Sequence, residues 1–380
     1  MKVAMILTDE REEFSQYEKP IPFFGPAPTA LLEGLCKCSE IELHIVSCTK
    51  KSMRAPEKLA SNIWFHLIRV RQWGWLRSAY SGCVVAIRKK LQQIQPDVVH
   101  GQGTERYCAL AAALSGFPNV ITIHGNMRPI AEINRARILS YQWCAAKLEQ
   151  FTLPRVDGVV CVSSHTESLV RELAPHTWLI PNAVTADFFA DRVPESGSRD
   201  ILCVGLVCSL KNQNALIQAL DRLAAEQNFR LVFLGRGSVS DPYFQEFLRL
   251  VCARPWCIHE GFVDSRTLKK FLRRAYALAL PSLEDNCPMV LLEAAAGGVP
   301  IMAARVGGIP DLVQDQQTGL LFDPSDPNSI ASAADRYLSD RSFAKQMAED
   351  ARIAAEKCFR PTVVADKHLE TYRQLLAEKH

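Results

Sequence analysis

Short apolar runs alternate with amphipathic stretches of helical length along this chain, and the alternation occurs twice. Such runs are typical of parallel strands, because helices cover both faces of a parallel sheet and bury its strands. A parallel strand also needs a long crossover, usually a helix, before the next strand can pair with it. The pattern therefore predicts an α/β fold with doubly wound sheets. With 380 residues, the chain is longer than one core usually supports, so two domains are expected.

A polar stretch at 192–200 separates the two series of strands. It contains Pro194, Gly197 and Ser198 and has the composition of a linker. The strand candidates before it are 3–7, 42–46, 98–100, 120–124, 158–162 and 179–180. Those after it are 201–204, 230–234, 257–259, 277–280, 301–303 and 319–322, and a final helix follows at about 361–379.

The segment from Pro281 to Pro300 joins the end of an apolar run to the start of a helix. Asn286 or Cys287 can cap this helix, and Pro288 suits its first turn. The first backbone N–H groups of a helix have no partner inside it, so they bind anions. In an open α/β sheet, ligands lie in the crevice beyond the carboxyl ends of the strands. The segment therefore predicts a diphosphate site.

Two carboxylates flank this helix start. Glu293 lies about five residues into the helix, or roughly 7 Å along its axis, which is too far to cap it. Its carboxylate can accept two hydrogen bonds from a ribose diol. Asp285, just before the helix, can accept from the hydroxyls of a sugar on the other side of the phosphates. The pair predicts a sugar-nucleotide site; the alternative is an ordinary capped helix with Glu293 on a solvated face.

The spacing of Asp285 and Glu293 resembles the paired-acid motif of retaining GT-B glycosyltransferases of family 4 type, in which two Glu are separated by seven residues. Asp takes the first place here, as in one sub-group, and Glu284 lies one position out of register. Further matches, in order across nearly the whole chain, are PDVVHGQG, VITIHGN, VVCVSSHT, LIPNAV, GLVCSLKNQNALIQAL, FLGRG, HEGFV and RVGGIPDLVQDQQTGLLFDPSD.

The resemblance implies a GT-B fold, in which two Rossmann-like domains face each other across a cleft. The acceptor-side domain would be 1–183, and the nucleotide-sugar domain would be 184–360. By the same resemblance, helix 361–380 crosses back to the first domain.

The resemblance also implies a phosphate-binding role for Lys211, in the turn 205–212, because the leaving diphosphate accumulates charge as the glycosidic bond breaks. Many family members carry Arg directly after the Gly of this turn, whereas this chain has Leu206. Arg236, Arg305 or the helix dipole could supply the missing charge.

His124 ends an apolar strand and precedes a glycine, and it resembles the family's histidine beside the transferred sugar. His100 has a similar place, and we interpret it as structural. The catalytic candidates are thus His124, Lys211 and Asp285. The remaining candidates for donor binding are backbone positions and neighbours of the helix start: Gly25, Gly205, Gly237, Val263, Glu284, Asn286, Cys287, Pro288, Met289, Val290 and Glu293.

The sequence contains no D-x-D, so a metal-bound diphosphate site is not indicated. We expect no metal and no cofactor, with a nucleoside-diphosphate sugar as the donor substrate and a glycan, lipid-linked glycan or other hydroxyl compound as the acceptor. The resemblance implies retention of anomeric configuration without a protein nucleophile. A GT-B epimerase or hydrolase and a non-catalytic sugar-nucleotide-binding protein remain as alternatives; Leu206 and Asp285 leave room for the latter.

The stretch 66–90 holds six basic residues and no acidic one, with Trp73, Trp75 and Tyr80 between them. It could rest on an anionic membrane or hold a lipid-linked acceptor, and the alternative is a buried helix with a solvated basic end. Nucleic acid is not expected as a partner, because the net charge is only +3 and no binding motif accompanies the stretch.

The thirteen cysteines are scattered, mostly in apolar contexts, and only Cys36 and Cys38 lie close together. They are typical of reduced thiols in a cytosolic protein. The N-terminal sequence predicts a strand rather than a signal peptide, and no apolar run approaches 18 residues. We therefore expect a cytoplasmic location, with the inner leaflet of the membrane as an alternative.

Overall fold

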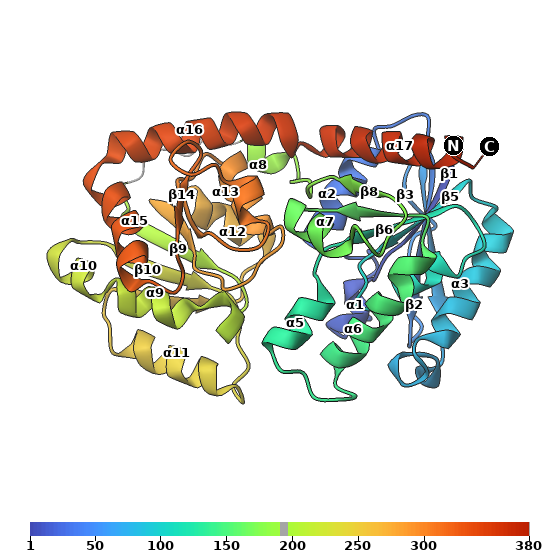
Figure 1. Cartoon of the computed structure of the whole chain (residues 1–380), viewed down its shortest axis with the longest axis horizontal. Coiled ribbons are helices and arrows are strands. Elements are labelled where there is room, and N and C mark those ends of the chain that lie inside the picture. The colour runs from blue at the N-terminus through green and yellow to red at the C-terminus, as the bar shows by residue number, and fades with distance from the viewer. Residues whose placement is uncertain (191–196, 380) are drawn as a thin grey trace. The chain divides into compact units, whose positions relative to one another are not determined.

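A computed structural model describes residues 1–190 and 197–379 (Figure 1). The chain forms two compact units, Met1–Ala183 with Pro361–His380 and Val184–Arg360. Each unit holds one largely parallel sheet covered by helices, so the predicted fold class is confirmed. The predicted linker at 192–200 lies mostly outside the described residues.

The sheet of the first unit has eight strands in the order β3-β4-β2-β1-β5-β6-β7-β8. All neighbours pair in parallel except β3 and β4. The strands are β1 (Lys2–Ile6), β2 (Glu42–Thr49), β3 (Lys58–Ala60), β4 (Ile63–Arg69), β5 (Val98–Gln102), β6 (Asn119–Ile123), β7 (Gly158–Cys161) and β8 (Thr177–Leu179). The helices are α1 (Glu10–Glu13), α2 (Pro26–Leu35), α3 (Ser81–Ile94), α4 (Tyr107–Ala113), α5 (Met127–Ile133), α6 (Tyr141–Thr152), α7 (Ser164–Val170) and α17 (Pro361–Ala377).

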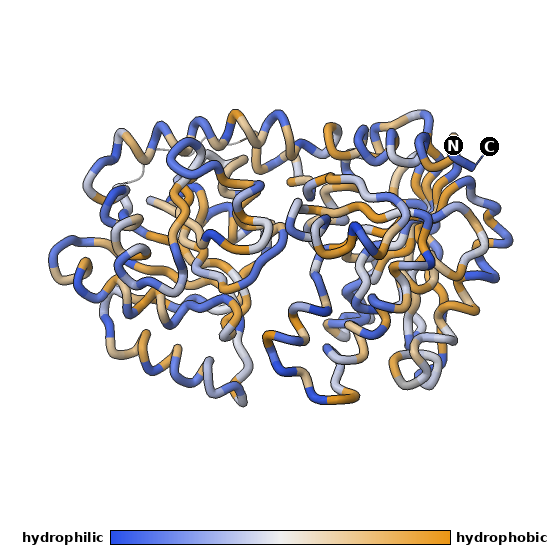
Figure 2. Tube along the Cα trace, in the orientation of Figure 1, coloured by the Kyte–Doolittle hydropathy of each residue, from blue (hydrophilic) through white to orange (hydrophobic). Residues whose placement is uncertain are grey.

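Both faces of this sheet are buried, which explains the apolar runs of its strands. Along β1, Ala4 and Ile6 belong to one hydrophobic core and Val3 and Met5 to the other, because successive side chains point to opposite faces. Figure 2 shows hydrophobic residues along the strands of both units and mixed colouring along the helices.

The last helix, α17, packs against α2 in the first unit, as the resemblance implies. Gly34 of α2 permits this close approach, since a Cβ there would lie 2.0 Å from the carbonyl oxygen of Pro361. Tyr372 and Leu375 of α17 are fully buried in the core beneath it. The C-terminal segment is therefore an integral part of the first unit.

The sheet of the second unit has six parallel strands in the order β11-β10-β9-β12-β13-β14. The order reverses between β9 and β12, and the carboxyl ends of these two strands therefore flank the crevice where ligands of such sheets bind. The strands are β9 (Asp200–Val204), β10 (Arg230–Leu234), β11 (Cys257–Gly261), β12 (Ala277–Leu280), β13 (Ile301–Ala304) and β14 (Leu320–Phe322). The helices are α8 (Asp187–Ala190), α9 (Gln213–Ala219), α10 (Asp221–Glu226), α11 (Pro242–Cys252), α12 (Ser265–Leu272), α13 (Met289–Ala296), α14 (Ile309–Leu312), α15 (Pro327–Ser339) and α16 (Arg341–Cys358).

The basic stretch 66–90 is not one helix, so the alternative of a buried helix describes only its last part. It begins in β4, passes through two short 3-10 turns and ends in α3. Trp73 is 67% exposed, but Trp75 is buried and donates its indole N–H to the carbonyl of Val70 at 3.2 Å. Tyr80 is buried beside it. The predicted membrane surface thus loses two of its three aromatic side chains to the core.

Every helix among the described residues is too short or too polar to span a membrane. In the same part of the chain, no three His, Cys, Asp or Glu side chains come together as metal ligands would. All thirteen cysteines are free thiols.

Candidate active site

Glycines end the first three strands of the second unit. Gly205, Gly235 and Gly261 follow or close β9, β10 and β11, and all three have positive φ. A Cβ on Gly235 would lie 1.8 Å from the carbonyl oxygen of Gly205, so these two turns touch through their backbones. Gly237 is also a required glycine, because the ring of Phe244 occupies the position of a Cβ. This edge of the sheet therefore offers backbone groups to a ligand.

Lys211 and Asp285 meet at the point where the strand order reverses. Lys211 follows β9 and Asp285 follows β12, and the lysine ammonium pairs with the Asp285 carboxylate. Ser282 Oγ donates to the same carboxylate oxygen at 3.0 Å. The two loops are also joined by a backbone bond of 2.8 Å from Leu283 to Leu210. Two of the three catalytic candidates are thus brought together, and the cation already has a counter-ion.

The loop after β13 also contacts Asp285, through its backbone. The N–H of Gly308 donates to the Asp285 carbonyl at 2.9 Å. Gly307 has φ +53°, and a Cβ there would lie 2.0 Å from that carbonyl oxygen. The glycine pair in RVGG therefore fixes the backbone that carries Asp285.

Helix α13 begins at Met289, with Pro288 as the N-cap residue and no side-chain cap. The prediction that Asn286 or Cys287 is the N-cap residue is wrong, because Pro288 takes that position. The side chain of a proline cannot accept from the N–H groups of Met289 and Val290, and the first N–H groups of a helix have no partner inside it. An uncapped helix start of this kind can bind an anion.

Glu293 is only 7% exposed, so the alternative of a solvated face is wrong. It lines a pocket with residues of α8 and α12, among them Phe188 and Lys269. Burial raises the pKa of its carboxyl from 4.5 to about 7, and the Lys269 ammonium opposes this shift. Lys269 also pairs with Asp187. The carboxylate thus lies in a pocket where desolvation would strengthen hydrogen bonds that it accepts.

Leu206, in the place where many family members carry Arg, is 52% exposed. The two arginines named as substitutes follow strands of the same sheet, Arg236 after β10 and Arg305 after β13. Arg305 pairs with Asp315. Arg236 is exposed, and its carbonyl accepts from the N–H of Val207 at 2.8 Å, which places its backbone beside the turn.

In the first unit, His124 follows β6 and lines a pocket with Gln102, Asn182 and His368. Its Nε2 lies 2.8 Å from Gln102 Oε1. Burial lowers the pKa of His124 to about 4, against a hydrogen bond to Asn182 that raises it. The imidazole is therefore neutral at physiological pH.

A chain of hydrogen bonds connects His124 to the interior of the first unit. The amide nitrogen of Gln102 lies 3.1 Å from Nε2 of His100, whose Nδ1 lies 2.6 Å from the hydroxyl of Tyr372 in α17. Thr122 Oγ1 also lies 2.7 Å from Nε2 of His100. The Gln102 amide accepts with its oxygen, so His124 carries its proton on Nε2 and leaves Nδ1 as an acceptor. His100 is fully buried, consistent with a structural role.

Gly25 is the N-cap residue of α2. A Cβ there would lie 2.8 Å from Oε1 of Glu10, so this glycine makes room for a carboxylate. Burial, together with the nearby Glu13, raises the pKa of Glu10 to about 7. A diphosphate beside Gly25 would face this acid, which favours the glycine as a packing residue.

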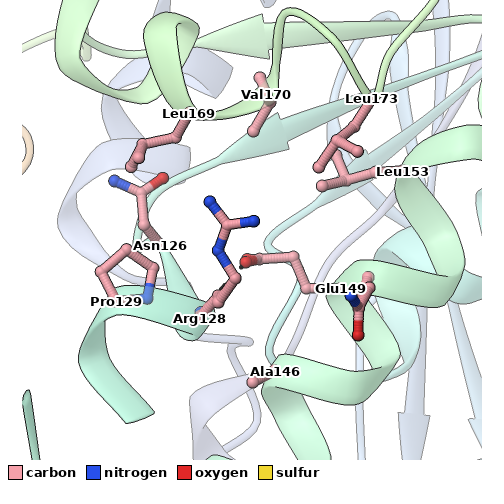
Figure 3. A pocket seen from close by; sticks show the side chains of 10 residues that line it. Asn126, Arg128, Pro129, Ala146, Glu149, Leu153, Leu169, Val170 and Leu173 are labelled. Atoms are coloured by element: carbon pink, nitrogen blue, oxygen red, sulfur yellow. Dashed lines mark hydrogen bonds between the residues drawn. The ribbon is translucent and has the colours of Figure 1, made fainter. Parts of the chain in front are cut away.

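Sequence reasoning missed Glu149, which holds the start of α5 just after His124 (Figure 3). Its carboxylate accepts from the N–H groups of Met127 and Arg128 at 3.1 and 3.2 Å and from Thr104 Oγ1 at 2.6 Å. Asn126 beside it is buried, and its Nδ2 has no hydrogen-bond partner among the described residues. No local sequence signal marks Glu149, because it caps a helix that precedes its own.

Two family models match the chain. The model described as glycosyl transferases group 1 matches residues 198–340, and the one described as glycosyltransferase family 4 matches residues 29–188. An uncharacterized glycosyltransferase, MJ1607 of Methanocaldococcus jannaschii, is 32% identical over 152 residues, which are 40% of this chain and 39% of that protein. Glycogen synthase of Mycobacterium tuberculosis H37Rv is 29% identical over 73% of this chain and 69% of its own length.

Among solved structures, Anabaena Alr3699/HepE in complex with UDP-glucose has the same fold. The TM-score is 0.72 at 15% identity, covering 98% of this chain and all of that chain.

Proposed function

We propose, from the premise that this chain belongs to the group 1 and family 4 glycosyltransferases, that it moves a sugar from a nucleoside diphosphate to a hydroxyl acceptor, without a metal and with retention of configuration. The observation that carries the proposal is the pairing of Lys211 with Asp285 at the strand-order reversal, beside the uncapped start of α13. A cation, a sugar-binding acid and an anion-binding helix end are the parts that a sugar diphosphate needs.

The diphosphate would take the N–H groups at the start of α13 and the ammonium of Lys211. In the free protein, Asp285 pairs with that ammonium, and Ser282 donates to the Asp285 carboxylate. When phosphate oxygens share the lysine, the Asp285 carboxylate becomes available to the hydroxyls of the transferred sugar. Glu293 would accept from the ribose diol, and the backbones near Gly237 and Val263 would contact the base.

In the reaction, the bond from the anomeric carbon to the diphosphate breaks, and a bond forms from the same carbon to the acceptor oxygen. The acceptor proton passes to the departing phosphate. Lys211 and the helix start stabilise the charge that develops on that phosphate. His124, held neutral by its burial, would lie beside the transferred sugar. The protein contributes positioning and electrostatic stabilisation rather than a nucleophile.

A uridine donor is the first candidate, because HepE of the same fold was solved with UDP-glucose. A glycan or lipid-linked glycan would be the acceptor. The rival reading, a protein that binds a sugar nucleotide without transfer, draws on the exposed Leu206 and the pairing of Arg305 with Asp315.

The test is a thermal-unfolding screen of UDP-, GDP- and ADP-sugars in EDTA, followed by transfer to glycan acceptors with NMR of the product anomer. A ligand that binds the native state raises its stability by mass action, so one sugar nucleotide should raise the Tm. The product should keep the donor's anomeric configuration. No shift with any donor would contradict the proposal. Binding without turnover would favour the rival reading, and release of free sugar in the absence of an acceptor would favour a GT-B hydrolase.

A further inference from the structure

The turn between α5 and α6 exposes an unusual set of apolar side chains for a loop. Ile133 is 51% exposed, Ile138 76%, Leu139 77% and Tyr141 42%. Single exposed apolar residues are common, but a contiguous group marks an interaction surface. We call residues 133–141 the α5–α6 tip. Figure 2 shows hydrophobic segments alternating with hydrophilic ones around this turn, at the end of the two helices away from the sheet.

The turn of the α5–α6 tip is closed by hydrogen bonds, although two of its residues have a disfavoured backbone conformation. Backbone hydrogen bonds join Ala136 to Ala131 at 2.8 Å and Ser140 to Arg137 at 2.9 Å, and Ser140 caps α6. Arg135 and Leu139 nevertheless have φ of +46° and +65°, a conformation that a Cβ disfavours. Residues held in such conformations cluster at functional surfaces.

The root of the tip is held firmly. Glu149 of α6 accepts from the first two N–H groups of α5, and the two helices pack side by side (Figure 3). The tip is therefore carried on a rigid pair of helices and not on a loose loop.

Charge around the tip has one predominant sign. Arg128, Arg135, Arg137 and Lys147 are exposed on α5, the tip and α6, and Glu132 is the one exposed acid in this part of the chain that the structure describes. Neither Arg135 nor Arg137 makes an ion pair with any described residue. The surface thus combines unshielded positive charge with exposed apolar side chains.

We propose that the α5–α6 tip docks this protein on an anionic lipid bilayer, with Ile138 and Leu139 entering the interface and the arginines meeting lipid phosphates. Apolar side chains rimmed by basic ones are what such an interface binds. A second copy of the chain fits less well, because a two-fold contact would bring the same arginines together. The tip belongs to the first unit and the donor-site residues to the second, and the proposal does not depend on the activity.

The experiment measures co-sedimentation of the full chain with vesicles of phosphatidylcholine alone and with about one-third phosphatidylglycerol. The protein should bind the anionic vesicles, and binding should weaken as salt rises from 0.1 to 1 M, because the Debye length falls from about 10 to about 3 Å. Arg135→Gln with Arg137→Gln should lower the partition about 25-fold, at about fivefold for each charge. Ile138→Ser with Leu139→Asn should lower it by at least about tenfold.

The matched control changes the same chemistry on α3, where Val85 is 68% exposed and Arg88 and Lys89 are exposed. Val85→Ser with Arg88→Gln and Lys89→Gln should bind vesicles as the wild type does, and all variants should keep its Tm. Equal affinity for neutral and anionic vesicles, or tip variants that bind as well as the control, would overturn the proposal. So would a wild-type dimer that the tip variants convert to monomers while vesicle binding stays unchanged.

Discussion

The ammonium of Lys211 has Asp285 as its counter-ion, and the hydroxyl of Ser282 donates to that carboxylate. Asp285→Asn removes the counter-ion but keeps the size of the side chain. We therefore expect the affinity for free UDP to be kept or to rise, while sugar transfer falls at least about tenfold because the sugar loses a charged hydrogen-bond acceptor. Calorimetric titration with UDP and a transfer assay measure the two effects. Parallel loss of both would contradict this division of roles.

Glu293 makes the stability of the second unit depend on pH, because burial raises the pKa of its carboxyl from 4.5 to about 7. Between these values the native state keeps a proton that the unfolded state has lost, so stability falls as pH rises from 4.5 to 7 and stays lower above that range. Glu293→Gln should therefore stabilise the second unit by on the order of 2–3 kcal/mol above pH 7 and by nothing below pH 4.5.

Urea unfolding of the Glu293→Gln variant at pH 4.5 and pH 8 measures this gain. The same variant should bind UDP more weakly, because a ribose diol loses its charged acceptor. A variant that is no more stable than wild type at pH 8 would show that the buried carboxyl carries no such penalty.

At the scale of elements, β5 and α17 fix the hydrogen bonding of His124, which follows β6. Gln102 of β5 bonds to His124, and His100 of the same strand bonds to Gln102 and to Tyr372 of α17. Gln102→Glu places a carboxylate where an amide oxygen stands, which stabilises the imidazolium and raises the pKa of His124 from about 4. The acid limb of the activity profile should move to higher pH, and NMR titration of the histidine ring should follow it. Tyr372→Phe is the control, because it removes only the hydroxyl at the end of the hydrogen-bond chain that is farthest from His124. An unchanged titration in Gln102→Glu would show that Gln102 does not control the pKa of His124.

Some contacts between elements could be predicted from the sequence, and others could not. The meeting of Lys211 and Asp285 follows from strand ends, because carboxyl ends of neighbouring parallel strands share one edge of a sheet. Strand β4 escapes prediction since its Phe65-His66-Leu67 alternation runs directly into a basic stretch that a helix could also carry. The bond from His100 to Tyr372 joins residues 272 positions apart, and no local pattern encodes such a pairing.

On the scale of the whole molecule, the two units should respond to acid in opposite directions. Burial lowers the pKa of His124 to about 4 and that of His368 to about 3, and it holds the pKa of His100 well below its usual value. The unfolded chain binds these protons first, so the three histidines lower the stability of the first unit as pH falls below 6.5. Buried Glu10 offsets part of this loss, whereas Glu293 makes the second unit gain. Calorimetry at pH 7.5 and 5.5 should show one transition moving down and another up. A common shift of both would contradict this.

The measurement that tests the account most directly is titration of UDP and a UDP-sugar into wild type, Lys211→Ala and Arg305→Ala, all in EDTA. Arg305 is the control, since it also pairs with an aspartate, Asp315, but follows β13, which does not flank the strand-order reversal. Lys211→Ala should lose about 10- to 150-fold in affinity for both ligands, the range for a hydrogen bond to a charged group, while Arg305→Ala binds as wild type does. Wild-type affinity in Lys211→Ala, or binding that appears only when magnesium or manganese is restored, would contradict a metal-independent diphosphate site at this strand-order reversal.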